Sequence, residues 1–261
     1  MISTTSIVLM GISGLFSILL PFIFILILRR RFSIRWIPIL IGAATFIIFA
    51  MVLEQISHLL VLRPGEGGEV HTLVDSPWLY VLYGVLAAGI FEETGRLTAF
   101  LLMKKKYRQV DSAISYGIGH GGIEAVIVLG LGMLNTIIFS FMINSGSSIV
   151  DTLPQATVES IVGTPAVAYA LGIVERIFAI GVHLGLSVIV FAAVMKGRWR
   201  LFPLAIVLHA LTNVTAAMMQ AGLITSMWVM YAGFIVMTLV TLWIAYNVSL
   251  RNRRIEENME I

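Results

Sequence analysis

The stretch IVLMGISGLFSILLPFIFILILRRR, residues 7–31, decides the class of fold. Its first 22 residues carry no charged side chain, and three arginines follow them directly. A helix needs about 20 apolar residues to span a bilayer. In a secretory signal peptide the positive charge precedes a shorter apolar region, whereas here it follows a long one. We therefore expect residues 7–28 to form a retained transmembrane helix.

The rest of the chain repeats this pattern. Of its 261 residues, 59% are hydrophobic and 12% are charged, about half of the ~25% charged residues of a soluble domain. Seven stretches are long and apolar enough to span: 6–28, 36–60, 78–102, 111–142, 166–195, 201–220 and 226–248. The sequence predicts an all-α fold, a polytopic transmembrane helical bundle of about seven spans. We expect one transmembrane domain over 1–261, with the site in a core region of about 78–220.

The basic residues fall in four clusters, each after an alternate predicted span. The clusters hold 14 of the 17 Lys and Arg residues: Arg29, Arg30, Arg31 and Arg35; Lys104, Lys105, Lys106 and Arg108; Lys196, Arg198 and Arg200; and Arg251, Arg253 and Arg254. Cytoplasmic loops are enriched in Lys and Arg, so the N-terminus is predicted outside and the C-terminus in the cytoplasm. The net charge of +3 thus reflects membrane topology, and we expect no nucleic-acid partner. The absence of cysteine excludes disulfides, thiolate metal sites and a cysteine nucleophile.

Charged side chains inside the third predicted span mark a candidate site. The segment FEETGR holds Glu92, Glu93 and Arg96. A charge at the bilayer centre costs about 2.5–3.5 kcal/mol on insertion, so such residues usually face the protein interior and serve function. Glu92 and Arg96 are four residues apart, and we expect them to form an ion pair on one helix face. Glu93 would then remain for another partner.

Three later spans add further polar side chains. They are His120 and Glu124 in SYGIGHGGIEA, Arg176 and His183 in the fifth span, and His209 and Asn213 in LHALTN. Of these, Arg176 lies nearer the outer side of the membrane than the histidines. At 1.5 Å per helical residue, Glu92 and the three histidines lie about 14–20 Å from the cytoplasmic ends of their spans. This depth is close to half of the hydrocarbon thickness, about 15 Å. We expect the four spans to bring these residues together.

The glycines around His120 favour close helix packing. Gly117 and Gly121 form a small-xxx-small pair, which lets two helices approach closely. We also expect water to reach the site from the cytoplasmic half, through room left by this glycine-rich span.

Three kinds of chemistry fit these residues. A buried glutamate can take a proton from water that a histidine orients, while His209 and Asn213 donate to the oxyanion of a scissile amide. A zinc hydrolase could use His120, His183, His209 and a glutamate, although the sequence has no HExxH. An ion-coupled transporter could relay protons through the same residues, but no inverted repeat is visible.

The order of three motifs adds a resemblance. FEETGR, SYGIGHGG and LHALTN together resemble the CAAX protease and bacteriocin-processing superfamily of membrane proteases, and VERIFAIGVHLGLS is similar to its YhfC-like branch of bacterial membrane peptidases. The resemblance covers roughly 78–215. It implies an intramembrane endopeptidase of glutamate type, without a cofactor, that cleaves membrane-embedded proteins or peptides in the lipid bilayer of a bacterial cytoplasmic membrane.

The resemblance also implies roles for individual residues. Glu92 would activate water with His120, His209 and Asn213 would hold the oxyanion, and Glu93 and Arg96 would organise the site. We expect three further residues to line it: His183, Glu124 and Arg176. EETGR places two residues between its second glutamate and the arginine, where the superfamily usually has three, so either Glu92 or Glu93 remains open as the base. Zinc dependence stays an alternative.

Overall fold

A computed structural model describes residues 1–63 and 75–259, with backbone alone for 250–259. The side chains of Arg251, Arg253 and Arg254 therefore lie outside the described part. The described elements are all helical, which confirms the predicted all-α fold. They are α1 (Thr4–Leu28), α2 (Trp36–Phe46), η1 (Ile47–Glu54), α3 (Gln55–Leu62), α5 (Pro77–Met103), α6 (Val110–Glu124), η2 (Ala125–Leu131), α7 (Gly132–Ser145), η3 (Ser148–Thr152), α8 (Gln155–Gly163), α9 (Ala166–Met195), α10 (Leu201–Gln220) and α11 (Met227–Met259).

Six helices of the described chain are long and apolar enough to cross a membrane. Two of them, Trp36–Leu62 and Val110–Ser145, are continuous helices that contain the π-helical segments η1 and η2. α5, which matches the third predicted span, 78–102, is 27 residues long but is not among the six. The chain is a multi-pass membrane protein, while the count of seven spans and the direction of the termini remain predictions.

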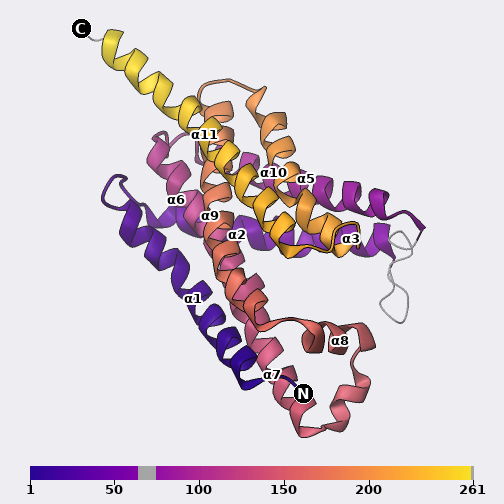
Figure 1. Cartoon of the computed structure of the whole chain (residues 1–261). Helices are drawn as coiled ribbons and strands as arrows, with labels where there is room; N and C mark the ends of the chain where they lie inside the picture. The colour runs from indigo at the N-terminus through magenta and orange to yellow at the C-terminus, as the bar shows by residue number, and fades with distance from the viewer. Residues whose placement is uncertain (64–74, 260–261) are drawn as a thin grey trace.

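α9 lies at the centre of the bundle (Figure 1). In its most apolar stretch 78% of the residues are buried, against 11–28% in the other five helices. It packs against α1, α5, α6, α10 and α11. Large apolar side chains such as Leu15, Leu134 and Trp243 are exposed on the outer helices. Lipid would cover this apolar surface. The charged and polar side chains lie instead in the interior of the bundle, where burying them is costly unless they serve a function.

α6 packs against its neighbours at backbone distance, as its glycines predict. A Cβ atom on Gly119 would lie 2.0 Å from the carbonyl oxygen of Ile39 on α2. A Cβ atom on Gly117 would lie 2.9 Å from the Cα atom of Leu184 on α9, and one on Gly121 would also contact α9. The small-xxx-small prediction is confirmed. The expectation that this span leaves room for water is wrong, because neighbouring backbone fills the space beside its glycines.

Candidate active site

The two glutamates of α5 point to different partners. Glu93 and Arg96 are completely buried, and Arg96 Nε donates to Glu93 Oε2 at 2.9 Å. Glu92 instead extends toward α6, where its Oε2 lies 2.8 Å from Nε2 of the fully buried His120. The expected Glu92–Arg96 ion pair is therefore wrong. Arg96 instead pairs with Glu93, three residues before it. Glu92 contacts His120, a residue that only the tertiary packing of α6 brings near.

Arg96 connects α5 to the central helix. Its Nη1 donates to the carbonyl oxygen of His183 at 3.0 Å and to the hydroxyl of Ser187. Its Nη2 lies 3.0 Å from His183 Nδ1. Since a guanidinium can only donate, His183 Nδ1 must accept this bond. A neutral His183 then carries its proton on Nε2.

His209 of α10 lies between the two carboxylates of α5. Its Nδ1 is 2.8 Å from Glu93 Oε1, and its Nε2 is 3.7 Å from Glu92 Oε1. Glu93 thus binds Arg96 with one oxygen and His209 with the other. Asn213 lies one turn beyond His209 on α10, where it lines a cavity of about 340 Å³ between α9, α10 and α11. His209 lines the same cavity.

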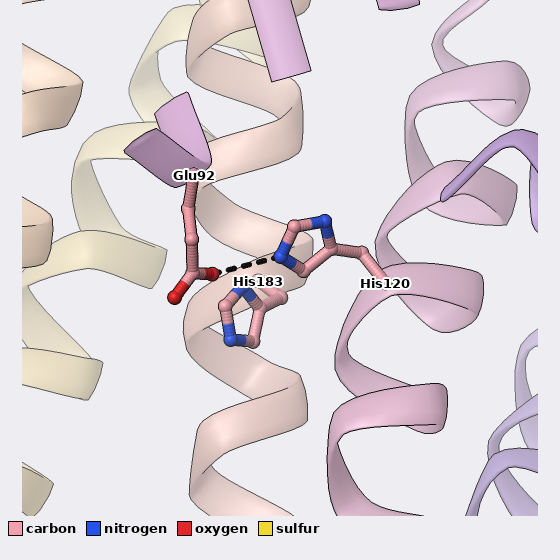
Figure 2. A group of neighbouring side chains, drawn as sticks. All are labelled: Glu92, His120 and His183. Carbon is pink, nitrogen blue, oxygen red and sulfur yellow. Dashed lines mark hydrogen bonds and ion pairs between the residues drawn. The ribbon is translucent and has the colours of Figure 1, made fainter. Parts of the chain in front are cut away.

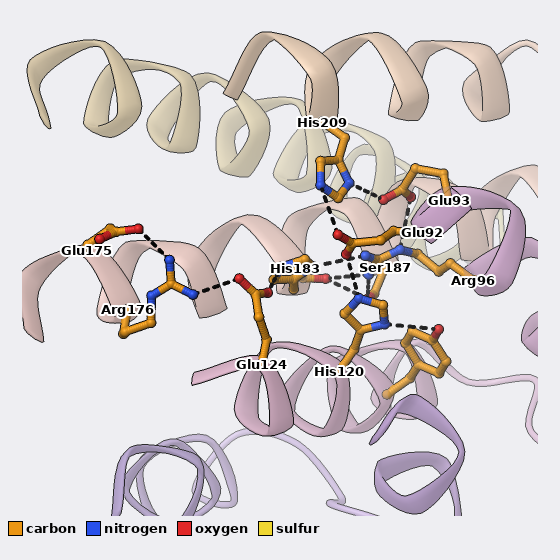
Figure 3. A network of polar contacts seen from close by, with 11 residues as sticks. Glu92, Glu93, Arg96, His120, Glu124, Glu175, Arg176, His183, Ser187 and His209 are labelled. Atoms are coloured by element: carbon orange, nitrogen blue, oxygen red, sulfur yellow. Dashed lines mark hydrogen bonds and ion pairs between the residues drawn. The ribbon is translucent and has the colours of Figure 1, made fainter. Parts of the chain in front are cut away.

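A second row of charges leads from His183 toward the N-terminal end of α9 (Figure 3). His183 Nε2 lies 2.5 Å from Glu124 Oε2, and Arg176 Nη1 donates to Glu124 Oε1 at 2.7 Å. The other arm of Arg176 binds Glu175. Glu124, Glu175 and Arg176 also line the 340 Å³ cavity. The structure therefore brings all nine predicted site residues into one polar cluster and the cavity beside it.

Three contributors were not predicted as site residues. Ser187 binds Arg96, Glu175 binds Arg176, and the Tyr116 hydroxyl lies 3.4 Å from His120 Nδ1. Ser187 and Tyr116 each lie four residues from a site histidine. The spacing that paired His120 with Glu124 would also have found them.

The cluster offers donors for a metal ion (Figure 2). Glu92, His120 and His183 each present one ligand atom, and these atoms lie within 4.8 Å of one another. His183 has both ring nitrogens engaged, by Arg96 and by Glu124. His209 has Nδ1 bound to Glu93 and Nε2 facing Glu92, which is the usual arrangement of a ligand histidine oriented by a carboxylate. The distances between donor atoms thus favour His183 as the third ligand. The hydrogen bonds favour His209, because among the described residues its Nε2 is not engaged by an arginine or by a second-row carboxylate.

The charges of the cluster do not balance. Glu92, Glu93 and Glu124 are buried or nearly so, and Glu175 is about one-third exposed at its side chain. Two guanidiniums, Arg96 and Arg176, oppose these four carboxylates. Because uncompensated buried charge is strongly unfavourable, the cluster calls for further positive charge. A divalent cation or protonated histidines would supply it, so the residues present fit a metal ion.

Comparisons with known proteins agree with this geometry. The family model described as YhfC intramembrane metalloprotease matches residues 16–235. The chain is also 38% identical over 232 residues to the membrane protein YhfC of Bacillus subtilis (strain 168), covering 86% of this chain and 89% of that one. No solved structure matches the chain. The family model and the Bacillus subtilis protein each match most of the chain, which therefore belongs to the YhfC family, described as intramembrane metalloproteases.

Proposed function

We propose that this protein is an intramembrane endopeptidase whose active site binds one divalent metal ion, zinc by ligand type. The observation that carries the proposal is the buried group of Glu92, His120 and His183, with donor atoms within 4.8 Å of one another inside a membrane bundle. Carboxylate and imidazole ligands suit zinc. The family description supports a protease over a transporter.

Glu92 and His120 would hold the ion together with a second histidine, either His183 or His209. A bound zinc ion would polarise the scissile carbonyl and activate a water molecule. The structure supports a structural task for each neighbour. Tyr116 lies behind His120, Glu93 orients His209, and Arg96 fixes the ring of His183.

The chain itself provides groups for the oxyanion. His209 and Asn213 lie one turn apart on α10, and both line the 340 Å³ cavity. If His183 is the metal ligand, or if no metal is bound, Nε2 of His209 can carry a proton while Nδ1 binds Glu93. This imidazole N–H and the amide N–H of Asn213 can then donate to the oxygen that becomes negative when water adds to a carbonyl carbon. The apolar part of the cavity wall, formed by Met219, Met230 and Phe234, would receive side chains of the peptide.

A metal-free route is the second candidate, and the Glu92–His120 contact of 2.8 Å favours it. Here Glu92 takes a proton from water while the water oxygen bonds to the carbonyl carbon. The C–N bond then breaks, and Glu92 passes the proton to the leaving nitrogen. This is the glutamate-type mechanism implied by the resemblance to CAAX-type proteases, a wider relationship that remains a proposal.

The proposed activity is tested by cleavage in a membrane. Purified protein in proteoliposomes is incubated with a library of quenched membrane peptides. We expect the wild type to cleave, and Glu92→Ala and His120→Ala to be inactive while melting as cooperatively as the wild type. Cleavage at the wild-type rate by both variants would show that the cluster is not the active site.

A further inference from the structure

A second cavity lies beside the first along α10. It has a volume of about 310 Å³ and lies between α3, α5 and α10. Its walls are rows of residues spaced by about one helical turn. These rows are Glu54, His58 and Leu62; Tyr80, Gly84 and Ala88; and Asn213, Ala217 and Gln220. Residues four apart lie on one helix face, so each row is a continuous stripe.

Two of these stripes lead to the proposed active site. One turn beyond Ala88 on α5 is Glu92, and one turn beyond Asn213 on α10 is His209. The side chain of Glu92 keeps 10% of its surface exposed, whereas those of Glu93 and His120 are completely buried. Glu92 is therefore the carboxylate of the pair that solvent can reach, and this cavity lies on the helix face that carries it.

The outer part of the cavity is polar, and no step of the proposed reaction uses its residues. Glu54 is 7% exposed, and its Oε1 lies 3.3 Å from His58 Nε2. His58 Nδ1 lies 3.0 Å from the Tyr83 hydroxyl, which lies 3.1 Å from the hydroxyl of Ser57. The carboxylate of Glu54 and the imidazole of His58 line one wall and the phenol of Tyr83 lines another, and these groups keep lone pairs and protons that water can satisfy.

The two cavities share the α10 residues Asn213, Ala216 and Gln220 but differ in their other walls. The first has an apolar wall of Met219, Met230 and Phe234, which suits a peptide. The second has Glu54 and His58, which suit water. Hydrolysis needs both reactants at one carbon atom, and two neighbouring cavities that share one face of α10 can deliver them by separate paths.

We propose that the cavity lined by Glu54, His58, Gly84 and Ala88 is the route by which water reaches Glu92. This assignment rests on the proposed function, because a water route to Glu92 has a use only if Glu92 takes part in hydrolysis. With about 30 Å³ per molecule in the liquid, the cavity has space for several waters. It also replaces the expected route along α6, which the packing of Gly117 and Gly119 closes.

The natural absence of cysteine permits a direct test of water access. Single-cysteine variants Ala88→Cys and Leu86→Cys are placed in lipid nanodiscs and treated with a charged thiol reagent. Ala88 lines the cavity, whereas Leu86 on the same helix is 39% exposed on the outer surface of the bundle, where lipid would cover it. We expect fast labelling at Ala88→Cys and none at Leu86→Cys. Labelling of Ala88→Cys no faster than that of Leu86→Cys would overturn the proposal.

A second experiment fills the cavity. A Cβ atom on Gly84 meets no atom within 4 Å, so Gly84→Leu adds bulk inside the cavity without a clash at the backbone. Gly132→Leu is the matched control, because Gly132 also has free space at its Cβ position but lies on α7 and lines neither cavity. We expect Gly84→Leu to lower kcat by about tenfold with KM unchanged, and Gly132→Leu to match the wild type.

The outcomes separate the water route from the protease assignment. A raised KM with unchanged kcat in Gly84→Leu would make this the peptide cavity, and wild-type kinetics would show that nothing needed passes through it; both overturn the proposal. Cysteine labelling needs no catalysis. If Ala88→Cys is labelled while the wild-type protein cleaves no peptide, the proposed function fails and the hydrated cavity stands.

Discussion

Glu93 accepts a hydrogen bond from Arg96 with one carboxylate oxygen and holds His209 with the other, at 2.9 Å and 2.8 Å. It thereby fixes a histidine of α10 against α5 and balances a guanidinium in the same buried place. This double use explains why two adjacent glutamates occur in one helix: Glu93 organises the residues that surround Glu92.

Glu93→Gln should lower turnover by about 10- to 100-fold, the usual effect of removing a partner that orients a ligand or catalytic group. Arg96 and His209 contact different oxygens of Glu93, and glutamine would place a donating NH2 group at one of these two positions. The measurement is kcat on a cleaved membrane peptide, with thermal unfolding to check that the variant is folded. Turnover equal to that of the wild type would contradict the organising role.

His183→Ala and His209→Ala should differ in metal content. If His209 is the third ligand, as its bond to Glu93 favours, His209→Ala purifies with little metal and His183→Ala retains it. The reverse result would make His183 the third ligand, as the distances between the donor atoms of Glu92, His120 and His183 favour. Elemental analysis of both purified variants decides between them. Equal wild-type metal content in both would exclude each histidine as a necessary ligand.

Arg176→Met should destabilise the protein by about 3 kcal/mol, because it leaves the mostly buried Glu124 without its guanidinium partner. Glu124→Gln in the same chain should recover part of this loss, since it removes the uncompensated charge. The melting temperatures of the wild type, the two single variants and the double variant form a double-mutant cycle that measures the coupling between Arg176 and Glu124. Strictly additive shifts would indicate that the pair does not couple.

Gly119→Ala should prevent correct packing of α6 against α2, since the added Cβ atom would lie 2.0 Å from the Ile39 carbonyl oxygen. Gly132→Ala adds the same atom to α7, where nothing lies within 4 Å. We expect a sharp fall in folded yield and melting temperature for the first variant and wild-type behaviour for the second. A stable, active Gly119→Ala protein would show that α2 can shift away.

The membrane helices could be read closely from the sequence, because apolar length and basic clusters are local properties. The expected stretches 166–195 and 201–220 coincide with α9 and α10, whereas α11 extends beyond the expected 226–248 to Met259. The π-helical segments η1 and η2 were not expected, since apolar composition does not distinguish a π-helix from an α-helix. The closeness of Glu92 to His120 was expected from their similar depth and from the family resemblance.

Partner choice inside the cluster could not be read in this way. Glu92 lies four residues before Arg96 and Glu93 lies three, so either could pair with it on a helix. Only the positions of α6 and α10 decide that Glu92 contacts His120 and that Glu93 contacts His209. The predicted water route along α6 was wrong for a similar reason. Glycines around His120 leave space in an isolated helix, but α2 and α9 fill it in the folded protein.

The metal content of the purified protein, measured together with its peptidase activity, tests the central claim most directly. We predict one zinc ion per chain, loss of cleavage on chelation, and recovery when zinc is added back. Undiminished cleavage by metal-free protein would contradict the metal-dependent assignment and would make Glu92 the general base of a glutamate-type peptidase.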